Sequence, residues 1–464
     1  MVLAVAAAAT GCGGGKPAAR PNVVVIVIDT LRADKLGSQG GERGLTPGID
    51  AFAGEGVLFE RAFNHAPWTL PACASILSGL HPKEHGAGGQ LPNFRALDAS
   101  VPTLPKVFAA AGYVTHAIVN VAFLGKTFEV TRDFDSLDAE FYSSNVEVRP
   151  AGPTTDAALT WLDKRGEEPF FLFVHYFDPH AVYDPPQPFR RRFAAPPDRE
   201  DESFVFGTRR HMEALRAGKL QLTPPIIRRA EALYDAEVAY TDSQVERLLD
   251  GLRERGLSDD TVVLLTGDHG EEFLDHGGFE HGHTVYDELC HIPLILRAPG
   301  LDPGRVGAVV RHVDIAPTLT ELCRVPAAET FVGLSLLPLA QGEDEPGRSV
   351  LAHGNMWGPP RTSFRGERFK LITGGGAPPE LYDWRADPGE TEDLAGDQPD
   401  QVQRLEGVLK AVAGHMDALS RGGTADLSPQ EAEALRGLGY GGGSDELAPD
   451  SSGDGGPQDP DKQR

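Results

Sequence analysis

Acidic and imidazole side chains stand directly after apolar segments of this chain. Asp29 follows the apolar run at residues 23–28, and the adjacent pair Asp268 and His269 follows the run at residues 261–267. Carboxylate oxygens and imidazole nitrogens are common ligands of zinc and manganese in proteins. Taken singly, an acid after a strand is commonly a helix cap, and a histidine is commonly a hydrogen-bonded core residue. Together, the three residues predict a site for a divalent cation.

Further candidates lie in two other segments. An apolar run at residues 170–177 contains His175 and is followed by Asp178 and His180. The segment FEHGH adds His281 and His283. We expect these side chains to lie near the same divalent cation site.

The apolar runs predict strands that place these residues. Residues 23–28 are almost entirely β-branched, which is typical of a strand buried on both faces of a parallel sheet. Helical spacing of apolar residues follows at 156–166 and 226–256. Alternating strands and helices favour a doubly wound α/β core. Such folds bind their ligands at the carboxyl edge of the sheet, where Asp29 and Asp268 would meet.

Composition limits the classes of partner. The chain has 464 residues and a formal net charge of -25, so binding to nucleic acid phosphates is not expected. No run of about 18 apolar residues is present to cross a membrane. The four cysteines lack the paired spacing of a zinc finger or of a dense disulfide framework. They are Cys12, Cys73, Cys290 and Cys323.

Changes in composition divide the chain into four parts. Residues 1–20 form the predicted signal and tether, in which residues 2–9 are small and apolar and Ala9-Thr10-Gly11-Cys12 resembles the lipobox of a bacterial lipoprotein. This resemblance implies lipidation of Cys12, export and a lipid anchor to the membrane, whereas a disordered Ala/Gly leader is the alternative. Residues 21–345 form the predicted catalytic α/β domain, 346–440 a smaller sheet-and-helix subdomain, and 441–464 a disordered acidic tail.

Seven segments resemble successive signatures of the sulfatase family, within the alkaline phosphatase superfamily. They extend from residue 21 to about residue 395. The resemblance implies a mixed sheet between layers of helices, with a smaller C-terminal sheet-plus-helix subdomain. The segments are NVVVIVIDTLRADKLG, LTPGIDAFAGEGVLFERAF, LPACASILSGLHPKEHG, TVVLLTGDHGEEF, YDELCHIPLILRAPG, VDIAPTLTEL and ELYDWRADPGETEDLA.

The third segment contains the family's nucleophile pattern, C/S-x-P-x-R, in altered form. Its downstream half, SGLHPKEHG, fixes the register and makes Pro71 the proline of the pattern. Thr69 then stands at the nucleophile position and Cys73 at the arginine position. Read from Cys73 instead, the pattern fails, because Ser75 and Leu77 occupy the proline and arginine positions. Thr69 cannot form formylglycine, since oxidation of a secondary alcohol gives a ketone, so no formylglycine is expected.

A threonine can act directly as a nucleophile when a divalent cation acidifies its hydroxyl. Thr69 resembles the threonine nucleophiles of phosphoester-cleaving members of the superfamily, and the implied metal ligands are Asp29, Asp268 and His269. Calcium-dependent sulfatases usually have Asp-Asp after the first strand and Asn after the late Asp, but this chain has Thr30 and His269 there. Zinc or manganese is therefore favoured over calcium.

The resemblance also implies roles for the surrounding polar residues. His180 matches the position that contacts the leaving group, and His281 the position that contacts the anion. Candidates for a second metal or for anion binding are Asp178, His175, His283, Arg32, Lys83 and Asn120.

The predicted function is metal-dependent hydrolysis of sulfate or phosphate esters of a glycan, lipid or metabolite. The alternatives are a phosphoester transferase or phosphodiesterase of the same superfamily, and an exported, non-catalytic binding protein with this fold. The chain gives no indication of its oligomeric state. Its predicted location is periplasmic or membrane-anchored, in a bacterium.

Overall fold

The computed structural model describes most of the chain. Residues 1–19, with Cys12, and the predicted acidic tail at 441–464 lie outside the described residues. Within the described part, no helix is both long and apolar enough to span a bilayer. The described residues are 20–90, 93–139, 148–194, 206–216, 219–343, 345, 347–419, 423–429, 431–432 and 435.

A nine-stranded sheet forms the centre of the larger part of the molecule. Its central strand, β1 (Asn22–Ile28), pairs in parallel with β7 (Phe170–Tyr176) and β8 (Thr261–Gly267). Beyond β8, β12 (Leu294–Arg297) runs antiparallel, so the sheet is mixed, as expected from the resemblance. The other strands are β2 (Val57–Phe63), β5 (Val114–Ile118), β6 (Ser136–Asp138), β11 (His291–Ile292) and β13 (Gly304–Arg311).

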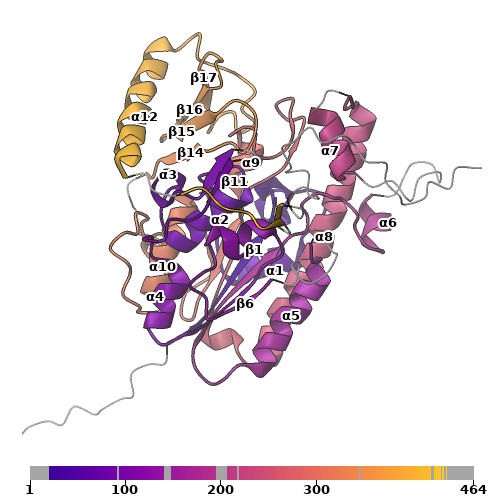
Figure 1. The fold of residues 1–464 in the computed structure, drawn as a ribbon, viewed down its shortest axis with the longest axis vertical. Coiled ribbons are helices and arrows are strands. Elements are labelled where there is room, and N and C mark those ends of the chain that lie inside the picture. The colour runs from indigo at the N-terminus through magenta and orange to yellow at the C-terminus, as the bar shows by residue number, and fades with distance from the viewer. Residues whose placement is uncertain are drawn as a thin grey trace, which may run out of the picture.

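Helices cover both faces of this sheet. Alternate residues of β1 point to opposite faces, and the residues on both faces are apolar. Val23, Val25 and Val27 belong to one apolar cluster, and Val24, Ile26 and Ile28 belong to another. Figure 1 shows α5 and α8 on one side of the sheet and α4 and α10 on the other. The first cluster includes residues of α2 (Thr69–Ser78), α4 (Leu104–Ala110) and α10 (Ile315–Leu322). The second includes residues of α1 (Pro47–Glu55), α5 (Ala151–Lys164) and α8 (Pro224–Glu254).

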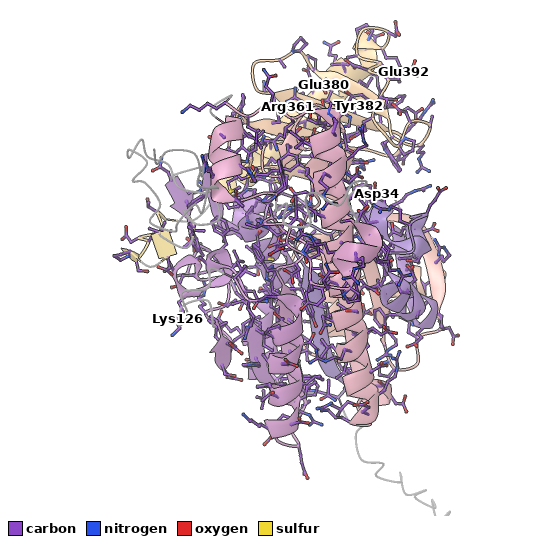
Figure 2. All side chains as sticks on the ribbon, turned by 90° about the vertical axis from the view of Figure 1, so that its right-hand side faces the viewer. Asp34, Lys126, Arg361, Glu380, Tyr382 and Glu392 are labelled. Atoms are coloured by element: carbon purple, nitrogen blue, oxygen red, sulfur yellow. The ribbon has the colours of Figure 1, made fainter. Side chains whose placement is uncertain are left out.

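A separate four-stranded antiparallel sheet lies in the C-terminal part, as expected (Figure 1). It consists of β14 (Val350–His353), β15 (Arg361–Arg365), β16 (Phe369–Gly374) and β17 (Glu380–Asp383). Its apolar face packs against α12 (Pro399–Leu419). Figure 2 shows Arg361, Glu380 and Tyr382 together on this sheet, with Asp34 below them in the larger part.

The turn after β14 joins the two parts close to the strand ends of the larger sheet. The backbone amides of Met356 and Trp357 donate to the carbonyl of Gly282, at 2.7 and 3.1 Å. The indole of Trp68 donates to the carbonyl of Gly354 at 2.6 Å.

The remaining short elements are α3 (Pro82–His85), α6 (Phe189–Phe193), α7 (Arg209–Arg216), α9 (Asp287–Cys290), α11 (Leu337–Ala340), β3 (Gly88–Gln90), β4 (Asn93–Arg95), β9 (Glu272–Phe273) and β10 (Phe279–Glu280).

Candidate active site

The register of β1 and β8 brings the predicted ligands together. Ile28 pairs with Gly267, so Asp29 and Asp268 leave the sheet side by side. His269 Nε2 lies 3.3 Å from Asp29 Oδ1 and 3.5 Å from Asp268 Oδ2. All three side chains are fully buried. The structure therefore brings these three side chains together at the carboxyl edge of the sheet.

Thr69 reaches this centre from the first turn of α2. Its Oγ1 lies 3.4 Å from Asp29 Oδ2 and 3.4 Å from His269 Nε2. Trp68 precedes it in an extended conformation, and the helix continues for ten residues to Ser78. A side chain at the start of a helix lies in the positive field of the helix dipole, which stabilises negative charge.

The donor atoms of this centre fit a divalent cation. Asp29 Oδ1 and Asp268 Oδ2 are buried and have no hydrogen-bond partner among the described residues. The other oxygen of Asp268 accepts hydrogen bonds from the backbone amides of Thr30 and His269, at 3.2 and 2.7 Å. His269 Nδ1 donates to the carbonyl of Gly270 at 2.9 Å. This bond orients the ring with Nε2 toward the carboxylates, as in metal-binding histidines.

The charges of the three residues depend on one another. Burial opposes the charge of His269, but Asp268 and Asp29 raise its pKa to about 9. Burial and the charge of Asp29 raise the pKa of Asp268 to about 7. A metal ion must displace protons from both ligands, so we expect its affinity to increase with pH.

The turn next to Asp29 has a strained backbone, which hydrogen bonds hold in place. Thr30 has a φ of +54°, which is unusual for a β-branched residue and costs on the order of 1–3 kcal/mol. Its amide donates to Asp268, and its carbonyl accepts from the hydroxyl of Tyr234 at 2.7 Å. These contacts fix the turn that follows β1.

Two further histidines line the centre. The ring of His281 lies 4.5 Å from the ring of His269 and 4.8 Å from the ring of His180. His281 Nδ1 donates to Glu271 Oε1 at 2.9 Å, and the hydroxyl of Tyr183 donates to Glu271 Oε2 at 2.9 Å. Burial lowers the pKa of His180 to about 4, so its ring is neutral near pH 7.

His175 and Cys73 also reach the centre. His175 pairs with Val27, so its side chain lies on the face of the sheet that α2 covers. Its Nε2 lies 3.4 Å from Asp29 Oδ2. Cys73, one turn after Thr69 on α2, is fully buried, and its sulfur lies within 4.8 Å of ligand atoms of His175 and Asp268.

Asp178 and Asn120 both bind polar groups of the protein. Asp178 Oδ2 accepts from the amide of Ala151 at 2.7 Å and so caps the start of α5. Asn120 donates to Thr154 Oγ1 at 3.0 Å and to the carbonyl of His175, while its oxygen accepts from Arg149 at 2.7 Å. A role of either residue toward an anion or a second metal stays a prediction.

Arg32 and His283 also bind polar groups of the protein. The five N–H groups of Arg32 all have acceptors, in Asp34, Asp275 and the carbonyl of Glu271, so none remains for a substrate anion. His283 Nε2 pairs with Glu272 at 2.8 Å, whereas its Nδ1 makes no hydrogen bond within the described residues. A role of His283 toward an anion or a second metal stays a prediction.

Lys83 lies half-buried on α3, a short helix that packs against α12. Anion binding by Lys83 stays a prediction.

Three residues around the centre were missed or misplaced by sequence reasoning. Glu271 lies two residues after His269 in the segment DHGEE, which is a usable signal. Cys73 lies four residues after Thr69, and helical spacing places both on one face. Tyr183 lies in an irregular segment and gives no such signal.

Comparison with known proteins agrees with the resemblance. The family model described as Sulfatase matches residues 21–325. The model described as N-sulphoglucosamine sulphohydrolase, C-terminal, matches residues 275–413. Arylsulfatase K of Gallus gallus is 27% identical over 87% of this chain and 85% of its own length. Delta 4,5-hexuronate-2-O-sulfatase of Bacteroides thetaiotaomicron is 25% identical over 83% of this chain and 87% of its own length.

Solved structures share the fold. The phosphonate monoester hydrolase of Agrobacterium radiobacter superposes with a TM-score of 0.68 at 22% identity, over 86% of this chain and 96% of that chain. The structure titled BT1596, a 2-O GAG sulfatase, superposes with a TM-score of 0.70 at 22% identity, over 91% of this chain and 98% of that chain. Both the central mixed sheet and the C-terminal sheet and helix belong to this shared fold.

Proposed function

The chain belongs to the sulfatase family and is an ester hydrolase, and from this premise we propose that Thr69 is its nucleophile and that a divalent cation is its cofactor. One observation carries the proposal. The hydroxyl of Thr69 lies 3.4 Å from both a carboxylate and an imidazole in a fully buried centre. The helix start supplies positive potential where the hydroxyl would lose its proton.

Asp29, Asp268 and His269 are the residues that would hold the cation. When bound there, a divalent cation lowers the pKa of a coordinated hydroxyl and draws negative charge from the transferred group. The nitrogen and oxygen donors favour zinc or manganese, with calcium as the alternative.

His180 and His281 are the candidates for the general acid and for the contact with the anion. A group that protonates the leaving oxygen must carry a proton near neutral pH. His180 is a poor donor, because burial keeps its pKa at about 4. We therefore favour His281 as the general acid, since its Nδ1 lies 2.9 Å from Glu271 Oε1 and this contact orients the ring. His180 then contacts the anion through its neutral ring.

The proposed substrate is a small anionic ester on a glycan, lipid or metabolite. The names of the relatives include sulfatases and a phosphonate monoester hydrolase, so both sulfate and phosphorus esters are candidates. We also propose export of the chain, with lipidation at Cys12.

Release of p-nitrophenol from its sulfate, phosphate and phosphodiester derivatives tests the nucleophile. With zinc, manganese and calcium supplied in turn, we expect Thr69→Ala to lower kcat roughly 10³-fold or more. Thr69→Ser retains a hydroxyl and should keep part of the activity.

Ser78→Ala is the matched control, because Ser78 lies on the same helix and its hydroxyl donates to the carbonyl of Ala74. We expect this control to behave like the unaltered protein. Unchanged activity in Thr69→Ala would overturn the proposal.

A further inference from the structure

A second set of ligand atoms adjoins the proposed cation site. Cys73, His175 and Asp268 place one sulfur, one imidazole nitrogen and one carboxylate oxygen within 4.8 Å of one another. Asp29, Asp268 and His269 form the first set by the same measure, so Asp268 belongs to both. All of these residues are fully buried.

Unpartnered atoms point into this second set. Among the described residues, His175 Nδ1 makes no hydrogen bond, and His175 Nε2 has only the carboxylate of Asp29 nearby, at 3.4 Å. Asp268 Oδ2 likewise makes no hydrogen bond there and has only His269 Nε2 nearby, at 3.5 Å. A buried imidazole nitrogen without a hydrogen bond destabilises the folded protein. Ligation of a cation would satisfy both groups at once.

The chemistry of the three donors selects the ion. Thiolate, imidazole and carboxylate are zinc ligands, and three protein ligands with an open fourth position are typical of catalytic zinc. Cys73 supplies the sulfur donor of the set.

We propose that Cys73, His175 and Asp268 form a thiolate-containing zinc site, with Asp268 bridging to the ion held by Asp29 and His269. The proposal extends the proposed function, because it adds a second ion beside the first. Binding replaces the thiol proton of Cys73, which passes to solvent, by a sulfur–zinc bond. Two ions bridged by a carboxylate would place more positive charge beside Thr69.

Metal analysis of the intact protein tests the proposal independently of activity. We expect two zinc ions per chain in the unaltered protein and one in Cys73→Ala. Cobalt(II) provides a second readout, since a cobalt–thiolate bond gives a charge-transfer absorption band in the near ultraviolet. We expect this band in the unaltered protein and its loss in Cys73→Ala and Cys73→Ser.

Cys323→Ala is the control, because Cys323 is likewise buried and unpaired, at the end of α10. It should retain both zinc ions and the band, and His175→Asn should lose one ion with Cys73 intact. One zinc ion in the unaltered protein, or the same spectrum in Cys73→Ala, would overturn this inference. The Thr69→Ala assay separately decides the proposed nucleophile, so the two failures are distinguishable.

Discussion

Glu271 links Tyr183 to His281 through its two carboxylate oxygens, at 2.9 Å each. The carboxylate fixes which ring nitrogen of His281 carries the proton and holds the ring beside His269. Loss of such a supporting group typically lowers activity about 10- to 100-fold. We expect Glu271→Gln to lower kcat in this range with little change in KM, and to shift the pH profile of kcat.

Glu272→Gln is the matched control for this substitution. Glu272 is the next residue, but its carboxylate pairs with His283 and not with His281. Steady-state kinetics of the two variants at several pH values separate the roles. Equal kinetics in both variants would show that the Glu271 contact does not support catalysis.

At the scale of elements, the loop between β9 and β10 attaches the C-terminal part through His276. Its Nδ1 donates to Glu288 of α9 at 2.9 Å, and its Nε2 donates to the carbonyl of Glu390 at 3.1 Å. Two donating nitrogens require the protonated ring. Burial opposes this charge, but Glu288 raises the pKa of His276 to about 9.

The raised pKa of His276 makes the folded protein less stable as the pH rises. The stabilisation is fully present below the ordinary histidine pKa of about 6.5 and is lost as pH rises through about 9. We expect the thermal unfolding midpoint to fall between pH 7 and pH 9.5, and to fall less in His276→Gln. His415→Gln, at an exposed position on α12, should retain the full dependence.

At the scale of the whole molecule, the C-terminal part contributes to the active site. Trp357 donates its indole N–H to the carbonyl of His281 at 2.8 Å, and its ring stacks on His283. Thus the turn after β14 supports the segment that carries the proposed general acid. We expect Trp357→Phe to lower kcat/KM roughly 3- to 10-fold, since one hydrogen bond contributes about 1 kcal/mol.

Trp384→Phe provides the comparison, because it also removes one indole hydrogen bond, to the carbonyl of Gly366 at 3.1 Å. That contact lies within the C-terminal sheet. Thermal unfolding and kcat/KM should show that both variants lose some stability, while only Trp357→Phe loses activity. Equal losses of activity would contradict a specific role for the turn after β14.

The sequence by itself determined the strand ends and the acidic residues that follow them. The apolar runs at β1 and β8 end at Asp29 and Asp268, and parallel neighbours in a sheet end at one edge. The long helices α5 and α8 were also predicted within a few residues, because apolar spacing depends only on local geometry. The domain boundary near residue 345 stays a prediction.

The tertiary structure alone decided which polar side chains face the centre. Asp178 caps α5, and Arg32 uses all its donors on two acids and a carbonyl, although both lie within four residues of a strand end. Cys73 and His175 meet although 101 positions separate them in the sequence. A side chain binds whichever partner folding places within hydrogen-bond reach, and distant segments supply most of these partners. Local sequence therefore fixes where a residue lies on its element, and packing fixes what that residue can do.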